Sequence, residues 1–93
     1  MNYCRTKIVC TLGPATATRD ALHGLVEAGM NVARINFSHG THEQHGETIA
    51  LVREVAKDLR RPVAILGDLQ GPRIRIGDIP APLPLENGTE VVL

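Results

Sequence analysis

Aromatic residues are nearly missing from this 93-residue sequence, which has no tryptophan, one tyrosine and one phenylalanine. Proteins that bind single-stranded nucleic acids stack the bases on aromatic side chains, so this composition disfavours that class of function. Ten basic residues balance ten acidic ones, and the net charge therefore gives no indication of a nucleic-acid partner. No apolar run approaches the roughly 20 residues that span a bilayer. We expect neither a nucleic-acid nor a membrane partner.

Cysteine is also scarce, with two residues in the chain. Cys4 and Cys10 would lie about 20 Å apart in a single strand, whereas a disulfide needs Cα atoms within about 7 Å of each other. The N-terminus lacks the apolar centre of a secretory signal. Two unpaired cysteines and no signal indicate a reducing compartment, and we predict a cytoplasmic protein.

What the sequence does contain is an alternation of strand and helix patterns. Three runs of β-branched and apolar residues predict strands, at residues 6–12, 31–36 and 62–68. Between them, apolar residues at helical spacing predict one helix between Thr18 and Gly29 and a second from Thr41 to about Arg60. Thr18 and Thr41 are suitable N-caps, and Gln44 completes a capping box with Thr41.

The order strand-helix-strand-helix-strand predicts an α/β fold with a parallel sheet. After the third strand, a segment rich in glycine and proline leads to residues 89–93, which have the composition of a further strand. Two helices and three strands cannot cover both faces of a parallel sheet or close a barrel. We therefore expect this chain to be part of a larger protein.

Polar side chains gather where the predicted strands end. Arg34 and Asn36 share one face of the second strand, Ser38 follows that strand, and Asp68 closes the third. Adjacent parallel strands would bring Asn36, Ser38 and Asp68 together. Amide, hydroxyl and carboxylate oxygens suit a hard cation, and a single carboxylate suits a monovalent ion. The alternative is that Asp68 caps a turn and the nearby arginines are solvated.

The remaining polar residues and turn signals differ in how well they fit a ligand-binding role. Arg34, Arg73 and Arg75 carry forked donors that suit phosphate or carboxylate groups. His42 and His45 are one residue short of the zincin spacing, so together with His39 they are interpreted as a solvated helix start rather than a zinc site. The pair formed by residues 13 and 14, Gly-Pro, predicts a turn.

Three segments carry a more specific signal. Residues 6–15 (TKIVCTLGPA), 29–40 (GMNVARINFSHG) and 67–75 (GDLQGPRIR) together resemble the N-terminal part of pyruvate kinase, in its bacterial form. The resemblance implies a TIM (β/α)8 barrel that is interrupted after its third strand by a small β-domain. Residues 1–69 would supply the first three βα units of that barrel, and residues 70–93 the start of the inserted domain.

The resemblance also implies an activity, namely the glycolytic transfer of a phosphoryl group from phosphoenolpyruvate to ADP, giving pyruvate and ATP. The protein would act as a homotetramer with Mg²⁺, whose ligands lie outside this chain, as does the family's catalytic lysine. In the family, the arginine matching Arg34 contacts the substrate and belongs to the catalytic site. The monovalent cation is held at the positions matching Asn36, Ser38, Asp68 and the backbone of Leu69. The nucleotide lies against the positions matching Asn36, Phe37, Ser38, His39 and Arg75.

One position departs from the potassium-dependent members of the family. They have a glutamate where this chain has Arg73, and members that do without potassium commonly have a lysine there. A fixed cation at residue 73 could replace K⁺ electrostatically, so we expect little or no potassium dependence. A second hypothesis is a truncated, non-catalytic product that binds phosphate ligands or pairs with a full-length subunit.

Overall fold

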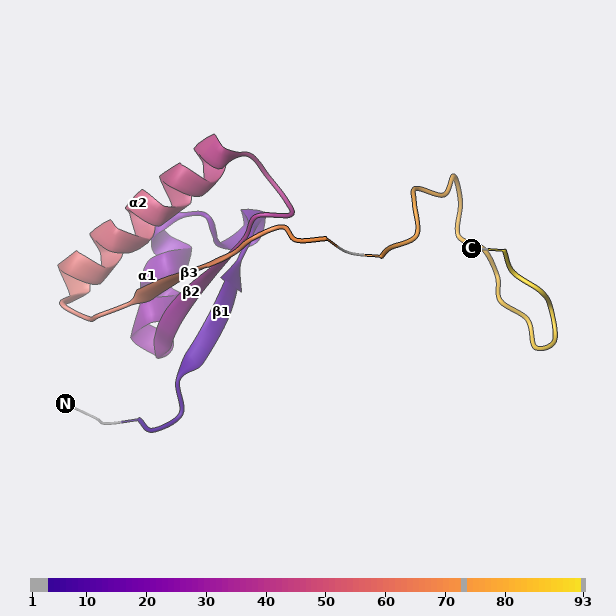
Figure 1. The fold of residues 1–93 in the computed structure, drawn as a ribbon. Helices are drawn as coiled ribbons and strands as arrows, with labels where there is room; N and C mark the ends of the chain where they lie inside the picture. Colours follow the sequence, from indigo (N-terminus) through magenta and orange to yellow (C-terminus); the bar gives the residue numbers. More distant parts are fainter. Residues whose placement is uncertain (1–3, 73, 93) are drawn as a thin grey trace.

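The computed structural model describes residues 4–72 and 74–92. The chain forms an α/β unit followed by an extended segment that leads away from it (Figure 1). The elements, in chain order, are strand β1 (Ile8–Leu12), the short 3-10 helix η1 (Pro14–Thr16), helix α1 (Arg19–Ala28), strand β2 (Met30–Asn36), helix α2 (His42–Leu59) and strand β3 (Ala64–Asp68). The predicted strand-helix alternation is confirmed. The predicted Gly-Pro turn continues into η1, because proline suits the first position of a helical turn.

The strands form a parallel three-stranded sheet in the order β1-β2-β3. Two strands are shorter than predicted, since β1 begins at Ile8 instead of residue 6 and β3 at Ala64 instead of residue 62. The pairing of β1 with β2 is irregular between Ile8 and Val9, where the Ile8 N–H donates to the Asn31 side-chain oxygen at 2.8 Å. The Asn31 side chain thus takes the place of a backbone acceptor where the pairing of β1 with β2 begins.

The helix ends follow from local chemistry and confirm the predicted caps. The Thr18 hydroxyl accepts from the Ala21 N–H, and Thr41 and Gln44 form a reciprocal capping box. At the other end of α1, Gly29 has a φ of 121°, a conformation that a residue with a Cβ rarely adopts. Helix α2 ends at Leu59, and Arg60 takes the left-handed conformation with φ 52°.

Both helices pack on one face of the sheet, so the two faces of β2 differ. Ala33 and Ile35 are buried against the helices, while Val32, Arg34 and Asn36 on the opposite face are only half-buried. The core lies between the sheet and the helices and consists of Leu12, Leu22, Val26, Met30, Ala33, Ile35, Val52 and Val55. Val9 and Leu66, on the uncovered face, are about half exposed, at 54% and 45%.

Charged contacts tie α1 to the elements that follow it. Arg19 forms ion pairs with Glu54 and Asp58 of α2, and the hydrogen bond to Glu54 is the main cause that raises the pKa of the Arg19 guanidinium. Arg61, after α2, donates to the carbonyl oxygens of Val26 and Glu27 at 2.9 and 3.2 Å. The positive charge of Arg61 at these carbonyls is favourable, because they form the negative end of the α1 helix dipole.

The strand predicted at residues 89–93, after β3, is wrong over the residues that the structure describes. Residues 89–92 form no strand, and residue 93 lies outside the described part of the chain. A strand needs a neighbour for its backbone hydrogen bonds, and the segment runs away from the sheet (Figure 1).

Cys4 and Cys10 are both free, as the sequence predicts. Within residues 4–72 and 74–92, neither helix combines the length and apolar character needed to cross a bilayer.

The uncovered sheet face leads to a stability prediction. Among the described residues, nothing covers one face of the sheet or pairs with its two edges. We therefore expect the isolated 93-residue chain to unfold gradually on heating, without a cooperative transition. Circular dichroism at 222 nm, recorded on a chain shown to be monomeric by sedimentation, measures this. A sharp sigmoidal transition in the monomer contradicts it.

Candidate functional site

Arg34 connects all three strands on the uncovered face of the sheet. Its Nη1 donates to the Thr11 hydroxyl of β1 at 3.0 Å, and its Nη2 forms an ion pair with the Asp68 carboxylate of β3. The register explains both contacts, because Thr11 lies directly beside Arg34, and Asp68 beside Asn36 at the next position on the same face. The Arg34 side chain is 29% exposed, so a ligand can still reach it. The alternative of a solvated arginine is wrong for Arg34.

Asn36 and Asp68 end their strands side by side, as predicted. The Asn36 side-chain oxygen accepts from the Ser38 N–H at 3.0 Å, which turns the chain sharply out of β2. The Phe37 N–H donates to the Asp68 backbone oxygen at 3.0 Å, so the start of the loop stays attached to β3. Neutral and anionic oxygens thus meet at the carboxyl edge of the sheet, beside the Arg34 guanidinium.

The histidines that follow differ from the predicted solvated helix start. His39 and His42 are exposed, but His45 is half-buried and its ring lies 4.9 Å from the Phe37 ring, between centroids. The His45 Nε2 is 2.6 Å from the His39 backbone oxygen. His45 therefore packs against the loop between β2 and α2 instead of pointing into solvent. Within the described residues, no three His, Cys, Asp or Glu side chains are placed to hold a metal.

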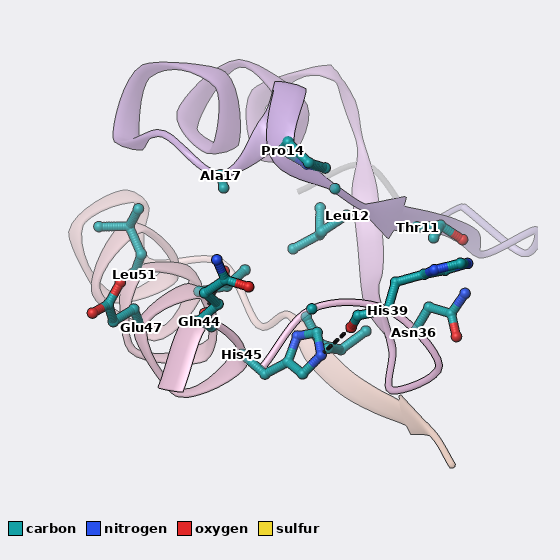
Figure 2. A pocket seen from close by; sticks show the side chains of 14 residues that line it. Thr11, Leu12, Pro14, Ala17, Asn36, His39, Gln44, His45, Glu47 and Leu51 are labelled. Atoms are coloured by element: carbon teal, nitrogen blue, oxygen red, sulfur yellow. Dashed lines mark hydrogen bonds between the residues drawn. The ribbon is translucent and has the colours of Figure 1, made fainter. Parts of the chain in front are cut away.

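A cavity of about 790 Å³ opens at the same edge of the sheet, between η1 and the first turns of α2. Figure 2 shows Asn36 and His39 on one side of it and Glu47 and Leu51 on the other. Its walls combine apolar and polar side chains, among them Leu12, Pro14, Ile35, Leu51, Asn36 and Gln44. Its size and mixed walls suit a small organic ligand.

Comparison with known proteins identifies the family. The family model described as "Pyruvate kinase, barrel domain" matches residues 3–93. The chain is 52% identical over 89 residues to a pyruvate kinase of Chlamydia trachomatis serovar D, covering 96% of this chain and 18% of the relative. It is 53% identical over 90 residues to the Geobacillus stearothermophilus pyruvate kinase, covering 96% and 15%, and 60% identical over 73 residues to that of Corynebacterium glutamicum, covering 78% and 15%.

This chain belongs to the pyruvate kinase family. It spans less than a fifth of the length of the curated pyruvate kinases that it matches.

Three further positions singled out by the resemblance to pyruvate kinase follow β3 in the sequence. The segment after β3 runs away from the sheet (Figure 1), and Arg75 within this segment is exposed. The backbone of Leu69 does lie at this edge, because Leu69 directly follows Asp68; the residue is 71% exposed. Arg73 lies outside the described residues, so the structure adds nothing to its sequence-based interpretation.

The donors expected to hold a monovalent cation fit that role chemically. Asn36, Ser38 and Asp68 offer amide, hydroxyl and carboxylate oxygens, which hard cations prefer. The Asn36 oxygen accepts from the Ser38 N–H, and the Asp68 carboxylate is paired with Arg34. A cation at this edge of a pyruvate kinase sheet would therefore share Asp68 with the guanidinium.

Sequence reasoning missed two features of the site. Thr11 was not a candidate, because its contact with Arg34 depends on the register between β1 and β2, which the sequence does not specify. The cavity was missed because its walls come from β1, η1, β2 and α2. The period-two alternation of β1, which places Thr11 opposite the apolar face, was the available signal.

Proposed function

We propose that this chain is the N-terminal part of a pyruvate kinase that transfers a phosphoryl group from phosphoenolpyruvate to ADP, giving pyruvate and ATP in glycolysis. The observation that carries the proposal is the Arg34 guanidinium, which Thr11 and Asp68 hold at the carboxyl edge of the sheet beside the cavity. Active sites of α/β proteins form at this edge. Family membership supports the choice of substrates.

The fold we propose for the complete protein is a TIM barrel, with residues 1–69 as its first three βα units. Two features support this. The sheet is parallel with both helices on one face, and the uncovered face carries Val9, Val32 and Leu66, apolar side chains that a barrel interior would bury. Residues 70–93 would lead into the inserted β-domain, where residues 89–92 would find the strand partners that they lack in this structure.

Arg34 is proposed to bind and orient the phosphoenolpyruvate phosphate. Phosphoryl transfer depends mainly on positioning and on neutralising charge, and a guanidinium provides forked donors for phosphate oxygens. The contacts to Thr11 and Asp68 restrict the Arg34 side chain before substrate binds. This preorganisation lowers the reorganisation needed to stabilise the transferring group.

ADP is proposed to occupy the cavity, with its phosphates toward Asn36, Phe37, Ser38 and His39 and with Arg75 added from the inserted domain. The apolar side chains of the cavity wall, which include Leu12, Pro14 and Leu51, suit a nucleobase, and Asn36 and His39, which also line the cavity, suit phosphate. Arg75 would have to approach from the extended segment.

The cations belong to the same proposal. Mg²⁺, whose ligands we place outside this chain, would neutralise phosphate charge. A monovalent cation would be held by Asn36, Ser38, Asp68 and the backbone of Leu69, unless Arg73 takes over its charge. We further propose a cytoplasmic homotetramer, on the resemblance and the cysteine usage alone.

Replacing Arg34 tests the proposed substrate contact. In a complete protein that carries this segment, we expect Arg34→Lys to lower kcat/KM for phosphoenolpyruvate by about 10²-fold, because lysine keeps the charge but loses the fork. ATP formation from phosphoenolpyruvate and ADP is measured with a coupled assay of pyruvate. The matched control is Arg19→Lys, which changes the α1–α2 ion pairs and should leave kcat/KM nearly unchanged.

Two outcomes contradict this account. Equal activity of the Arg34→Lys and Arg19→Lys proteins removes Arg34 from the substrate site. A complete wild-type protein that forms no ATP from phosphoenolpyruvate and ADP excludes the proposed reaction and favours the non-catalytic alternative. The isolated 93-residue chain should be inactive in the same assay, because most of the proposed barrel is missing from it.

The potassium requirement can be measured separately. We expect the rate of the complete protein to change little when potassium is replaced by sodium or Tris, because Arg73 would supply a fixed positive charge in place of the potassium ion. The complementary variant Arg73→Glu should then acquire potassium activation. Strong activation of the wild type by potassium contradicts the role assigned to Arg73.

A further inference from the structure

The loop between β2 and α2, residues 37–41, is held at both of its sides. On the side of the sheet, the Phe37 ring covers Gly67 so closely that a Cβ at residue 67 would lie 2.9 Å from the Phe37 Cε2. On the side of α2, the His45 ring centroid lies 4.9 Å from that of Phe37. The His45 Nε2 is 2.6 Å from the His39 backbone oxygen, the contact dashed in Figure 2. One histidine of α2 thus contacts both the start and the middle of the loop, and it also lines the cavity.

The His45–His39 contact fixes the protonation of the ring nitrogen. A backbone carbonyl oxygen can only accept, so the His45 Nε2 must carry a hydrogen and donate it. The loop also fits closely around this ring, because a Cβ at Gly40 would lie 3.2 Å from the His45 Cε1. Gly40 has a φ of 75°, which a side chain would strain. The loop therefore packs closely against the His45 ring at Gly40 as well as at His39.

We propose that His45 is a positioning residue for the nucleotide site. By donating to the His39 carbonyl and packing on Phe37, it keeps the loop in the conformation that presents Asn36, Ser38 and His39 to the ADP phosphates. This inference rests on the proposed function. Without the donor, the loop occupies its binding-competent conformation for a smaller fraction of the time, and the apparent affinity for ADP falls by that fraction.

Three variants of a complete protein separate the hydrogen bond from packing. His45→Phe keeps a ring but removes the donor, His45→Ala removes both, and His45→Gln restores an N–H donor of similar reach. We expect Phe and Ala at residue 45 to weaken ADP binding about three- to tenfold, the range for one lost hydrogen bond, and Gln to restore most of it. The KM for phosphoenolpyruvate should change little.

The measurements are the Kd for ADP by titration calorimetry, the steady-state KM values for both substrates, and the melting temperature of each protein. His42→Ala is the matched control, since His42 is exposed in the same turn, 6.3 Å from the Phe37 ring. It should bind ADP like the wild type. This control tests whether a ring contact with Phe37 alone accounts for any change.

Unchanged ADP affinity in the Phe and Ala variants overturns the inference. So does a Gln variant as weak as Ala, or the failure of all three variants to fold, because either result makes His45 a packing residue only. A wild-type protein that binds ADP but forms no ATP contradicts the proposed reaction instead. In that case the order Gln above Phe and Ala in ADP affinity still supports the role of His45.

Discussion

The site depends on the parallel register of β2 with both of its neighbours. This register places Thr11 beside Arg34 and Asp68 beside Asn36, so one guanidinium on the central strand reaches a hydroxyl on one side and a carboxylate on the other. The same register directs Ala33 and Ile35 to the helices. A slip by one residue would reverse both faces, moving Arg34 into the core and Ile35 out of it.

The fold and the chemistry of the site therefore have one origin. The helices α1 and α2 bury only one face of β2, and the opposite face changes from apolar at Val32 to polar at Arg34 and Asn36 toward the carboxyl edge. There the chain turns through Asn36 and Ser38 and is fixed by Phe37 over Gly67 and by His45. The Arg34 guanidinium, held between β1 and β3, and the loop of residues 37–41, held between the sheet and α2, therefore lie next to each other at the carboxyl edge.

Local features of this structure were predictable, and contacts between distant residues were not. Thr18, Thr41 and Gly29 act within one helical turn, so their sequence positions sufficed to locate the helix ends. Thr11 and Arg34 are 23 residues apart, and His45 contacts the loop through the fold, so neither contact could be read from spacing. The strand expected at residues 89–93 was wrong over residues 89–92, because composition alone provides no pairing partner.

The central claim is that Arg34 and Asp68 act as one unit at the substrate site. A double-mutant cycle tests it most directly, comparing kcat/KM for phosphoenolpyruvate in the wild type, Arg34→Lys, Asp68→Asn and the double variant of a complete protein. We predict that the two changes are strongly non-additive, with a coupling energy above about 1 kcal/mol, because each removes the same restrained guanidinium geometry. Additivity within about 0.5 kcal/mol would show that the two residues act independently and would contradict the account.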